Sequence, residues 1–134
     1  MDDKFWIICA ALCALCSNGL AWAGDTSPEA QLQKWSAEAG QAGQPDRGQA
    51  FFTQKHGYEW SCATCHGNPP TEQGKHASTG KTLKPLAPVA NPGSMTDQAK
   101  LNKWFRRNCK EVLKRECTPT EKSDVLAWLI QLKR

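Results

Sequence analysis

The sequence lacks a long apolar run, a block of basic residues and internal repeats. Its most apolar stretch, from Phe5 to Leu15, is shorter than the roughly 20 residues that a membrane-spanning helix needs. The 17 Lys and Arg residues alternate with 13 Asp and Glu residues, so no segment is typical of a nucleic-acid-binding tract and no nucleic-acid partner is expected. A chain of 134 residues without repeats has the length of one domain.

The first 23 residues have the pattern of a signal peptide. Lys4 precedes the apolar run, and Ala21-Trp22-Ala23 places small residues at positions −3 and −1 of a cleavage site. We therefore predict a signal peptide over residues 1–23, cleavage before Gly24, a periplasmic location and a single domain over residues 24–134. The alternative is an uncleaved membrane anchor, which the short apolar run disfavours.

Removal of this segment changes the charge and the cysteine count. One Lys and two Asp residues leave with it, so the net charge rises from +4 to +5, which favours acidic partners through electrostatic steering. Of the seven cysteines, four remain in an oxidising compartment, namely Cys62, Cys65, Cys109 and Cys117.

The segment Cys62-Ala63-Thr64-Cys65-His66 has the C-x-x-C-H pattern of covalent haem attachment. Two intervening residues bring both sulfurs to one edge of a porphyrin, and the adjacent histidine is placed to reach the iron. A thioredoxin-like pair would need a βαβ pattern, and a zinc site would need further ligands at suitable spacing. We predict one haem c, bound through Cys62 and Cys65 with His66 as proximal ligand. The other ring N–H of His66 is expected to donate to the carbonyl of Pro69 or Pro70.

Capping signals predict an all-α architecture. Ser27-Pro28 starts a helix with Leu32 and Trp35 on one face, and the segment from Gly40 to Pro45 ends it. A short helix from about Asp46 to Thr53 follows, in which Gly48 would allow close approach of another helix. Residues 67–94 have no sustained period and are predicted to be irregular.

Two helices are predicted in the C-terminal third of the chain. Thr96 is expected to cap a helix from Asp97 to about Leu113. Thr118-Pro119-Thr120-Glu121 is a capping box that opens the last helix, whose apolar stripe is Val125, Leu126, Leu129 and Leu132. This organisation resembles a small class I-like cytochrome c, and the resemblance implies a fold of about four helices wrapped around one covalently bound haem.

The sixth iron ligand decides between an electron carrier and a ligand-binding haem protein. Met95 is the one methionine after the signal peptide and leads on residue type. His56 lies in a turn-like His-Gly pair, and His76 is typical of a solvated loop. Asn108 is favoured by periodicity, because it shares an apolar helical stripe with Leu101, Trp104, Phe105 and Val112. A buried amide there needs a partner, which could be backbone, water or iron.

The blocks "CATCHG", "TGKTLKPLAP" and "RRNCKEVLKRECTPTEKSDVLAWL" resemble a family of small exported cytochromes, the sphaeroides-type haem protein (SHP) and its bis-histidine relative cytochrome c''. The resemblance covers most of residues 24–132. It implies that the residue before the first C-terminal cysteine is the distal ligand, which is Asn108 here. It also implies a disulfide between Cys109 and Cys117.

Asn108 offers a hard oxygen donor that suits ferric iron better than ferrous iron, so reduction should loosen it. The resemblance then implies a haem protein that takes electrons from a membrane-bound or multihaem cytochrome and binds O2 or NO when reduced. We expect a monomer. The alternative is a six-coordinate His/Met electron shuttle with Met95 as ligand. No enzymatic reaction is assigned, since the sequence positions no acid or base to deliver protons.

Overall fold

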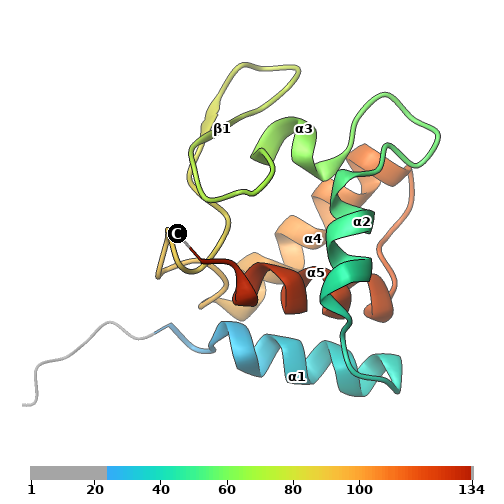
Figure 1. The fold of residues 1–134 in the computed structure, drawn as a ribbon, viewed down its shortest axis with the longest axis vertical. Coiled ribbons are helices and arrows are strands. Elements are labelled where there is room, and N and C mark those ends of the chain that lie inside the picture. Colours follow the sequence, from blue (N-terminus) through green and yellow to red (C-terminus); the bar gives the residue numbers. More distant parts are fainter. Residues whose placement is uncertain (1–23, 134) are drawn as a thin grey trace, which may run out of the picture.

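Five helices and one short hairpin follow one another along residues 24–133, the part of the chain that this computed structural model describes (Figure 1). The predicted signal peptide lies outside the described residues. The all-α class is confirmed, and no helix between residues 24 and 133 is long and apolar enough to cross a membrane. The elements are α1 (Pro28–Ala39), α2 (Pro45–Thr53), α3 (Cys62–His66), β1 (Gly74–Lys75), β2 (Thr82–Leu83), α4 (Gln98–Leu113) and α5 (Pro119–Gln131).

Local capping chemistry sets the ends of the first and last helices as predicted. The Ser27 hydroxyl accepts a hydrogen bond from the Ala30 N–H at 3.1 Å, and Gly40 ends α1 in the left-handed region at a φ of 67°. At the start of α5 the Glu121 N–H donates to Thr118 Oγ1 at 3.2 Å, while the Thr118 N–H donates to Glu121 Oε2 at 2.8 Å. This reciprocal pair is the predicted capping box.

Helix α5 is the centre of the fold, because α1 and α2 both pack against it. A Cβ atom at Gly48 would overlap the carbonyl oxygen of Asp124, so the close helix approach expected at this glycine is confirmed. The buried Asp124 carboxylate accepts hydrogen bonds from Arg47 Nε at 2.8 Å and Arg47 Nη2 at 2.9 Å. It also accepts one from the Gln44 N–H at 2.6 Å, which ties the start of α2 to α5.

Because α5 is covered on several sides, it is buried beyond the predicted stripe. Val125, Leu126 and Leu129 are buried as expected, whereas Leu132 is the residue that follows the helix and is only half-buried. Trp128 is buried as well and its ring lies 5.0 Å from that of Phe52 on α2. The sequence periodicity missed Trp128, because a helix enclosed on several faces has no single apolar stripe.

Two predicted helix starts and the predicted number of helices need correction. Helix α2 begins at Pro45 rather than Asp46, which puts the proline in the first turn. The cap of α4 is Asp97 rather than Thr96: the Asp97 carboxylate accepts from the Lys100 N–H at 2.8 Å, while the Thr96 hydroxyl donates to the Gly93 carbonyl. The haem-motif segment, residues 62–66, is itself a short helix, so five helices stand where about four were expected.

A further correction concerns residues 67–94, which contain an antiparallel hairpin instead of irregular chain alone. Gly74 pairs with Leu83 and Lys75 with Thr82, and the His76 N–H donates to the Lys81 carbonyl at 2.8 Å across the tip. A Cβ at Gly74 would overlap the Cys65 carbonyl oxygen. The hairpin therefore lies directly on α3 (Figure 1).

Candidate haem site

A cavity of about 760 Å³ lies between α4 and the other helices. Its lining comes from α2, α3, the hairpin, α4 and α5, and apolar side chains such as Phe52, Leu101, Phe105 and Leu126 form much of it. This volume lies within the range of roughly 300 to 1,000 Å³ that is usual for cofactor sites. The fold thus provides an apolar space large enough for a flat prosthetic group.

Cys62, Cys65 and His66 all line this cavity from α3. The short helix is held by its own cap, because the Ser61 hydroxyl accepts from the Thr64 N–H at 3.2 Å and Thr64 Oγ1 accepts from the Ser61 N–H at 2.9 Å. On a helix, residues three apart lie on the same face, so the two thiols are presented together. Both cysteines are free and half-buried. The sequence motif is therefore brought to one wall of the cavity.

Burial controls the protonation of these groups. It raises the pKa of the Cys62 thiol to about 11. Burial also lowers the pKa of His66, and the nearby His76 lowers it further. The His66 imidazole is therefore neutral at neutral pH, which is the form that can donate a lone pair to a metal.

The predicted hydrogen bond from His66 to a following carbonyl is wrong. His66 Nδ1 is buried and has no hydrogen-bond partner among residues 24–133. The Pro70 carbonyl instead accepts from the N–H groups of Leu86 and Ala87, both at 3.1 Å. The chain after α3 thus pairs with the later loop instead of turning back beneath the ring.

Asn108 faces the same cavity from α4. It is half-buried, and its side-chain amide has no hydrogen-bond partner within the described part of the chain. The predicted stripe of Leu101, Phe105 and Val112 lines the cavity with it. The backbone of the described chain therefore makes no hydrogen bond to the Asn108 amide, and this group is available to bind a ligand.

Met95 also lines the cavity, so both main candidates for a sixth ligand lie at the same site. Its side chain is 7% exposed and packs in the core cluster with Trp35, Phe52 and Trp128. A core position of this kind is the ordinary role of a methionine.

The two other histidine candidates are engaged elsewhere. His56 lies in a turn outside the cavity lining, with Nε2 2.7 Å from the Phe51 carbonyl oxygen. His76 lines the cavity, but its Nε2 lies 3.2 Å from Glu111 Oε1 on α4, and its Nδ1 lies 3.0 Å from Thr79 Oγ1. This contact between the hairpin and α4 was not predicted, because the two residues lie 35 positions apart and leave no local signal in the sequence.

The disulfide that the family resemblance implied is present between Cys109 and Cys117, whose Cα atoms lie 5.6 Å apart. It joins the end of α4 to the start of α5. Val112 and Leu113 pack around it in a small apolar cluster. The residue next to Asn108 is therefore covalently anchored.

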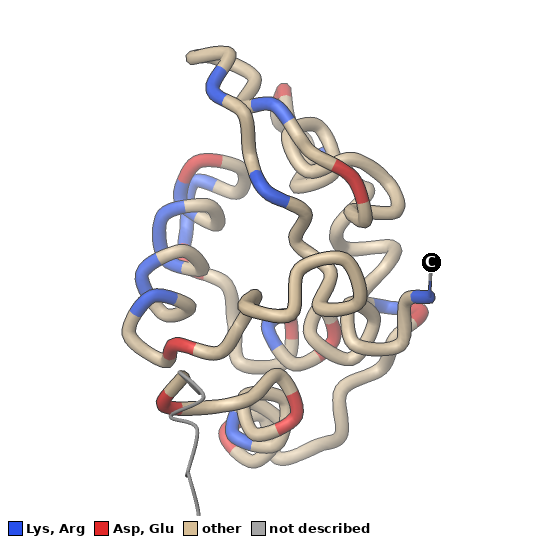
Figure 2. The backbone as a smooth tube through the Cα atoms, turned by 90° about the vertical axis from the view of Figure 1, so that its left-hand side faces the viewer, with Lys and Arg blue, Asp and Glu red and all other residues tan. Residues whose placement is uncertain are grey.

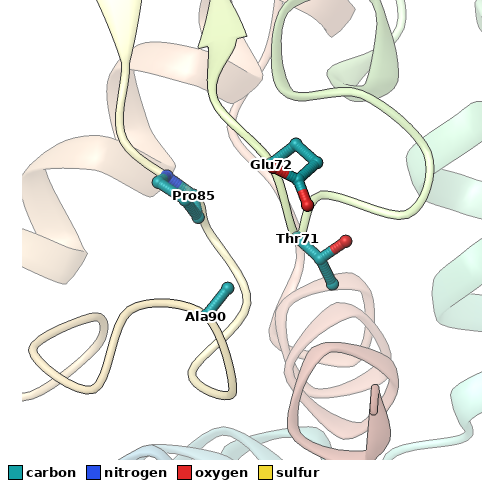
Figure 3. Close-up of a pocket in the computed structure, with 4 residues that line it drawn as sticks. All are labelled: Thr71, Glu72, Pro85 and Ala90. Atoms are coloured by element: carbon teal, nitrogen blue, oxygen red, sulfur yellow. The ribbon is translucent and has the colours of Figure 1, made fainter. Parts of the chain in front are cut away.

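A second hollow, of about 450 Å³, lies between residues 71–72 and 85–90. Figure 3 shows Thr71 and Glu72 on one side of it and Pro85 and Ala90 on the other. Glu72 is the one charged residue in this lining, and it is exposed. The hollow holds no grouping of reactive side chains.

A helical fold that brings a C-x-x-C-H segment and a neutral histidine to an apolar cavity is that of a c-type cytochrome. Proteins of this class bind haem c covalently, so haem c is the cofactor of this chain. The family described as domain of unknown function DUF1924 matches residues 38–129. The chain belongs to this family. It also belongs to the family of c-type cytochromes that includes SHP and cytochrome c''.

The relatives cover most of the chain. Cytochrome c-type protein SHP of Cereibacter sphaeroides is 45% identical over 130 residues, which are 94% of this chain and 96% of the relative. Cytochrome c'' of Methylophilus methylotrophus is 39% identical over 87 residues, which are 62% of this chain and 60% of that protein.

Two solved structures share the fold. Oxidised SHP, which is described as an oxygen-binding cytochrome c, has a TM-score of 0.73 and 47% identity, and the match covers 79% of this chain and 97% of that one. Oxidised cytochrome c'' has a TM-score of 0.72 and 32% identity, with coverage of 80% and 95%.

Proposed function

We propose that this chain is an exported, periplasmic monohaem cytochrome whose distal ligand, Asn108, is released on reduction so that O2 or NO can bind. Cys62 and Cys65 hold the haem by thioether bonds, and His66 is the proximal ligand. The observation that carries the proposal is the free amide of Asn108, which lines the same cavity as His66 and has no partner among residues 24–133.

The residues of the cavity suit this cofactor. When bound, haem c supplies a one-electron Fe(III)/Fe(II) couple and, where a position on the iron is free, a site for a diatomic gas. The two thiols fix the orientation of the group, and the apolar walls exclude water from it. The lowered pKa of His66, caused first by burial, keeps its imidazole ready to ligate.

Asn108 supplies the redox dependence. Its carbonyl oxygen is a neutral, hard donor, which binds ferric iron better than the softer ferrous iron. Its neighbour Cys109 is anchored by the disulfide, so Asn108 can turn aside at its side chain while α4 keeps its place. The Asn108 amide N–H would then be available to donate a hydrogen bond to a bound gas. The description of SHP as an oxygen-binding cytochrome supports the same role here.

The electrons are proposed to come from a membrane-bound or multihaem cytochrome. The protein would then act as a monomeric electron-transfer and gas-binding protein rather than as an enzyme with turnover. Among the described residues, His76 of the hairpin is the one histidine besides His66 that lines the cavity, and its ring is paired with Glu111.

The second candidate is a six-coordinate electron shuttle with Met95 as the sixth ligand. The observation in its favour is that Met95 lines the same cavity. A thioether binds ferrous iron well, so this ligand would stay in place on reduction and no gas would enter.

Absorption spectra of the wild-type protein in both oxidation states separate the two. We expect a six-coordinate ferric spectrum and a high-spin, five-coordinate ferrous spectrum that shifts on addition of CO, O2 or NO. A low-spin ferrous spectrum that CO leaves unchanged would contradict the proposal and favour Met95.

A further inference from the structure

The net positive charge of the domain is concentrated on one helix. Residues 24–133 carry 15 Lys and Arg, because Lys4 and Arg134 of the 17 in the whole chain lie outside this range. They carry 11 Asp and Glu, because Asp2 and Asp3 of the 13 lie outside it. Helix α4 alone carries five cations and one acid, a net charge of +4 that equals that of the whole described domain. Figure 2 shows these blue positions following one another along a single helix.

Most of these cations are free of acidic partners. Lys100, Lys103 and Arg106 are exposed and have no ion-pair partner among residues 24–133, and Arg107 lies over the Trp104 ring at 5.2 Å. The one carboxylate of α4, Glu111, is paired with His76 at the cavity. Lys110 is paired with Glu116 at 3.4 Å, whereas the other four cations of α4 present positive charge that the described chain does not neutralise.

An exposed aromatic side chain lies within this charge. Trp104 is 42% exposed and also lines the cavity, so it borders both the solvent and the haem site. Lys100 and Arg107 line the cavity beside it, and Lys81 and Lys84 line it from the hairpin side. Tryptophan and arginine are the residue types that contribute most to binding at protein interfaces.

We infer that the outer face of α4, built from Lys100, Lys103, Trp104, Arg106, Arg107 and Lys110, is the docking surface for an acidic redox protein. The inference rests on the proposed electron-transfer function and names the chemistry of its partner. The partner would bind the helix that carries Asn108, so electrons would enter next to the ligand that reduction releases. Positive charge gathered at the cavity mouth would also steer an acidic protein to this side.

An acidic protein fits this face better than an anionic membrane surface. Membrane-bound faces combine basic residues with several large apolar side chains. Among residues 24–133, the exposed large hydrophobic side chains are Trp104 and Tyr58, and only Trp104 belongs to α4. A single aromatic ring among cations suits a specific protein contact.

The test uses the haem-loaded protein and a reduced plant-type [2Fe–2S] ferredoxin as an acidic probe. The variant Lys103→Glu/Arg106→Glu reverses two exposed charges that do not line the cavity. The matched control Lys55→Glu/Lys133→Glu changes the net charge equally at exposed positions outside α4. Stopped-flow reduction of the ferric protein should slow about tenfold or more at low salt in the α4 variant, with the difference vanishing at high salt.

A second readout needs no electron transfer. Oxidised ferredoxin added to the ferric protein should shift backbone amide resonances of α4 in the wild type and the control, but not in the α4 variant. Equal rates and equal shifts in the two variants would overturn the inference. It would also be overturned if ferredoxin reduced the α4 variant at the wild-type rate while that variant no longer bound phosphatidylglycerol vesicles. The release of Asn108 on reduction is tested separately, by the wild-type spectra. If Asn108 were not released, the reduction rate by ferredoxin would still depend on salt.

Discussion

Asn108 and Cys109 are neighbours on α4 with opposite roles. Cys109 is bonded to Cys117, whereas the amide of Asn108 has no partner among residues 24–133 and lines the cavity that also receives His66. A rigid covalent anchor thus lies next to the one side chain that is proposed to move. Under the proposed function, this pairing explains why an asparagine and a cysteine stand together inside a basic helix.

Export and haem attachment can be tested by mass. The purified protein should begin at Gly24 and carry the mass of one haem under denaturing conditions, since the thioethers survive unfolding. The Cys62→Ser/Cys65→Ser variant should lose the haem on acid extraction. A retained leader, or a wild-type mass without haem, would contradict the assignment.

The disulfide should stabilise the fold. It closes a loop of about nine residues, which corresponds to roughly 2.5 kcal/mol in the chain-entropy model. Cys109→Ser/Cys117→Ser should lower the free energy of unfolding by about that amount in urea denaturation. Its ferric spectrum should keep its form, because the disulfide acts on the anchor of α4 and not on the iron. A stability equal to that of the wild type would show that the bond is not a staple.

Glu121 should make part of the stability dependent on pH. Burial by itself would raise the pKa of this carboxyl, but hydrogen bonds from Arg115 and from the Thr118 N–H outweigh burial, and the pKa lies below its usual value. Its contribution is therefore present above the unfolded pKa and is lost as the pH falls through the lower folded value. Glu121→Gln should flatten the decline in unfolding free energy below about pH 5. An unchanged acid profile in this variant would argue against the role.

The contact between the His76 imidazole and the Glu111 carboxylate should limit access to the cavity. It joins the hairpin to α4 with an Nε2 to Oε1 distance of 3.2 Å, and both residues line the cavity. Glu111→Gln should raise the CO association rate of the ferrous protein by up to about fivefold, because an amide oxygen accepts from the His76 ring less strongly than a carboxylate, a difference worth up to ~1 kcal/mol. Glu116→Gln breaks the exposed Lys110 pair away from the cavity and is the matched control. Equal rates in the two variants would mean that the hairpin does not restrict entry.

Local signals made much of this fold predictable. The caps at Ser27 and Thr118 depend on a few adjacent residues, and the close approach at Gly48 follows from the absence of a side chain. The C-x-x-C-H segment also needs only its own spacing. The pairing of Cys109 with Cys117 depended on the family resemblance, because spacing alone does not fix a partner.

Features that depend on distant parts of the chain could not be predicted. The hairpin has strands of only two residues, too short for a visible alternation. The partners of the Pro70 carbonyl lie 16 and 17 positions further on, at Leu86 and Ala87, so the failed expectation for His66 depended on the path of a loop. The pair of His76 with Glu111 likewise arises only when the hairpin folds onto α4.

Replacement of Asn108 by His offers a gain-of-ligand test. Imidazole at the same position on α4 is a stronger-field donor than an amide oxygen. Asn108→His should therefore give a low-spin ferric spectrum, as expected for bis-histidine ligation. A ferric spectrum identical to that of the wild type would place residue 108 away from the iron.

The most direct test of the central claim compares the ferric and ferrous spectra of Asn108→Ala and Met95→Ala. If Asn108 is the redox-dependent ligand, Asn108→Ala opens the ferric iron to water or added anions, whereas Met95→Ala leaves the form of both spectra nearly unaltered. The contrary result is a Met95→Ala protein that alone loses a low-spin ferrous spectrum, which would make Met95 the ligand and the protein an electron shuttle.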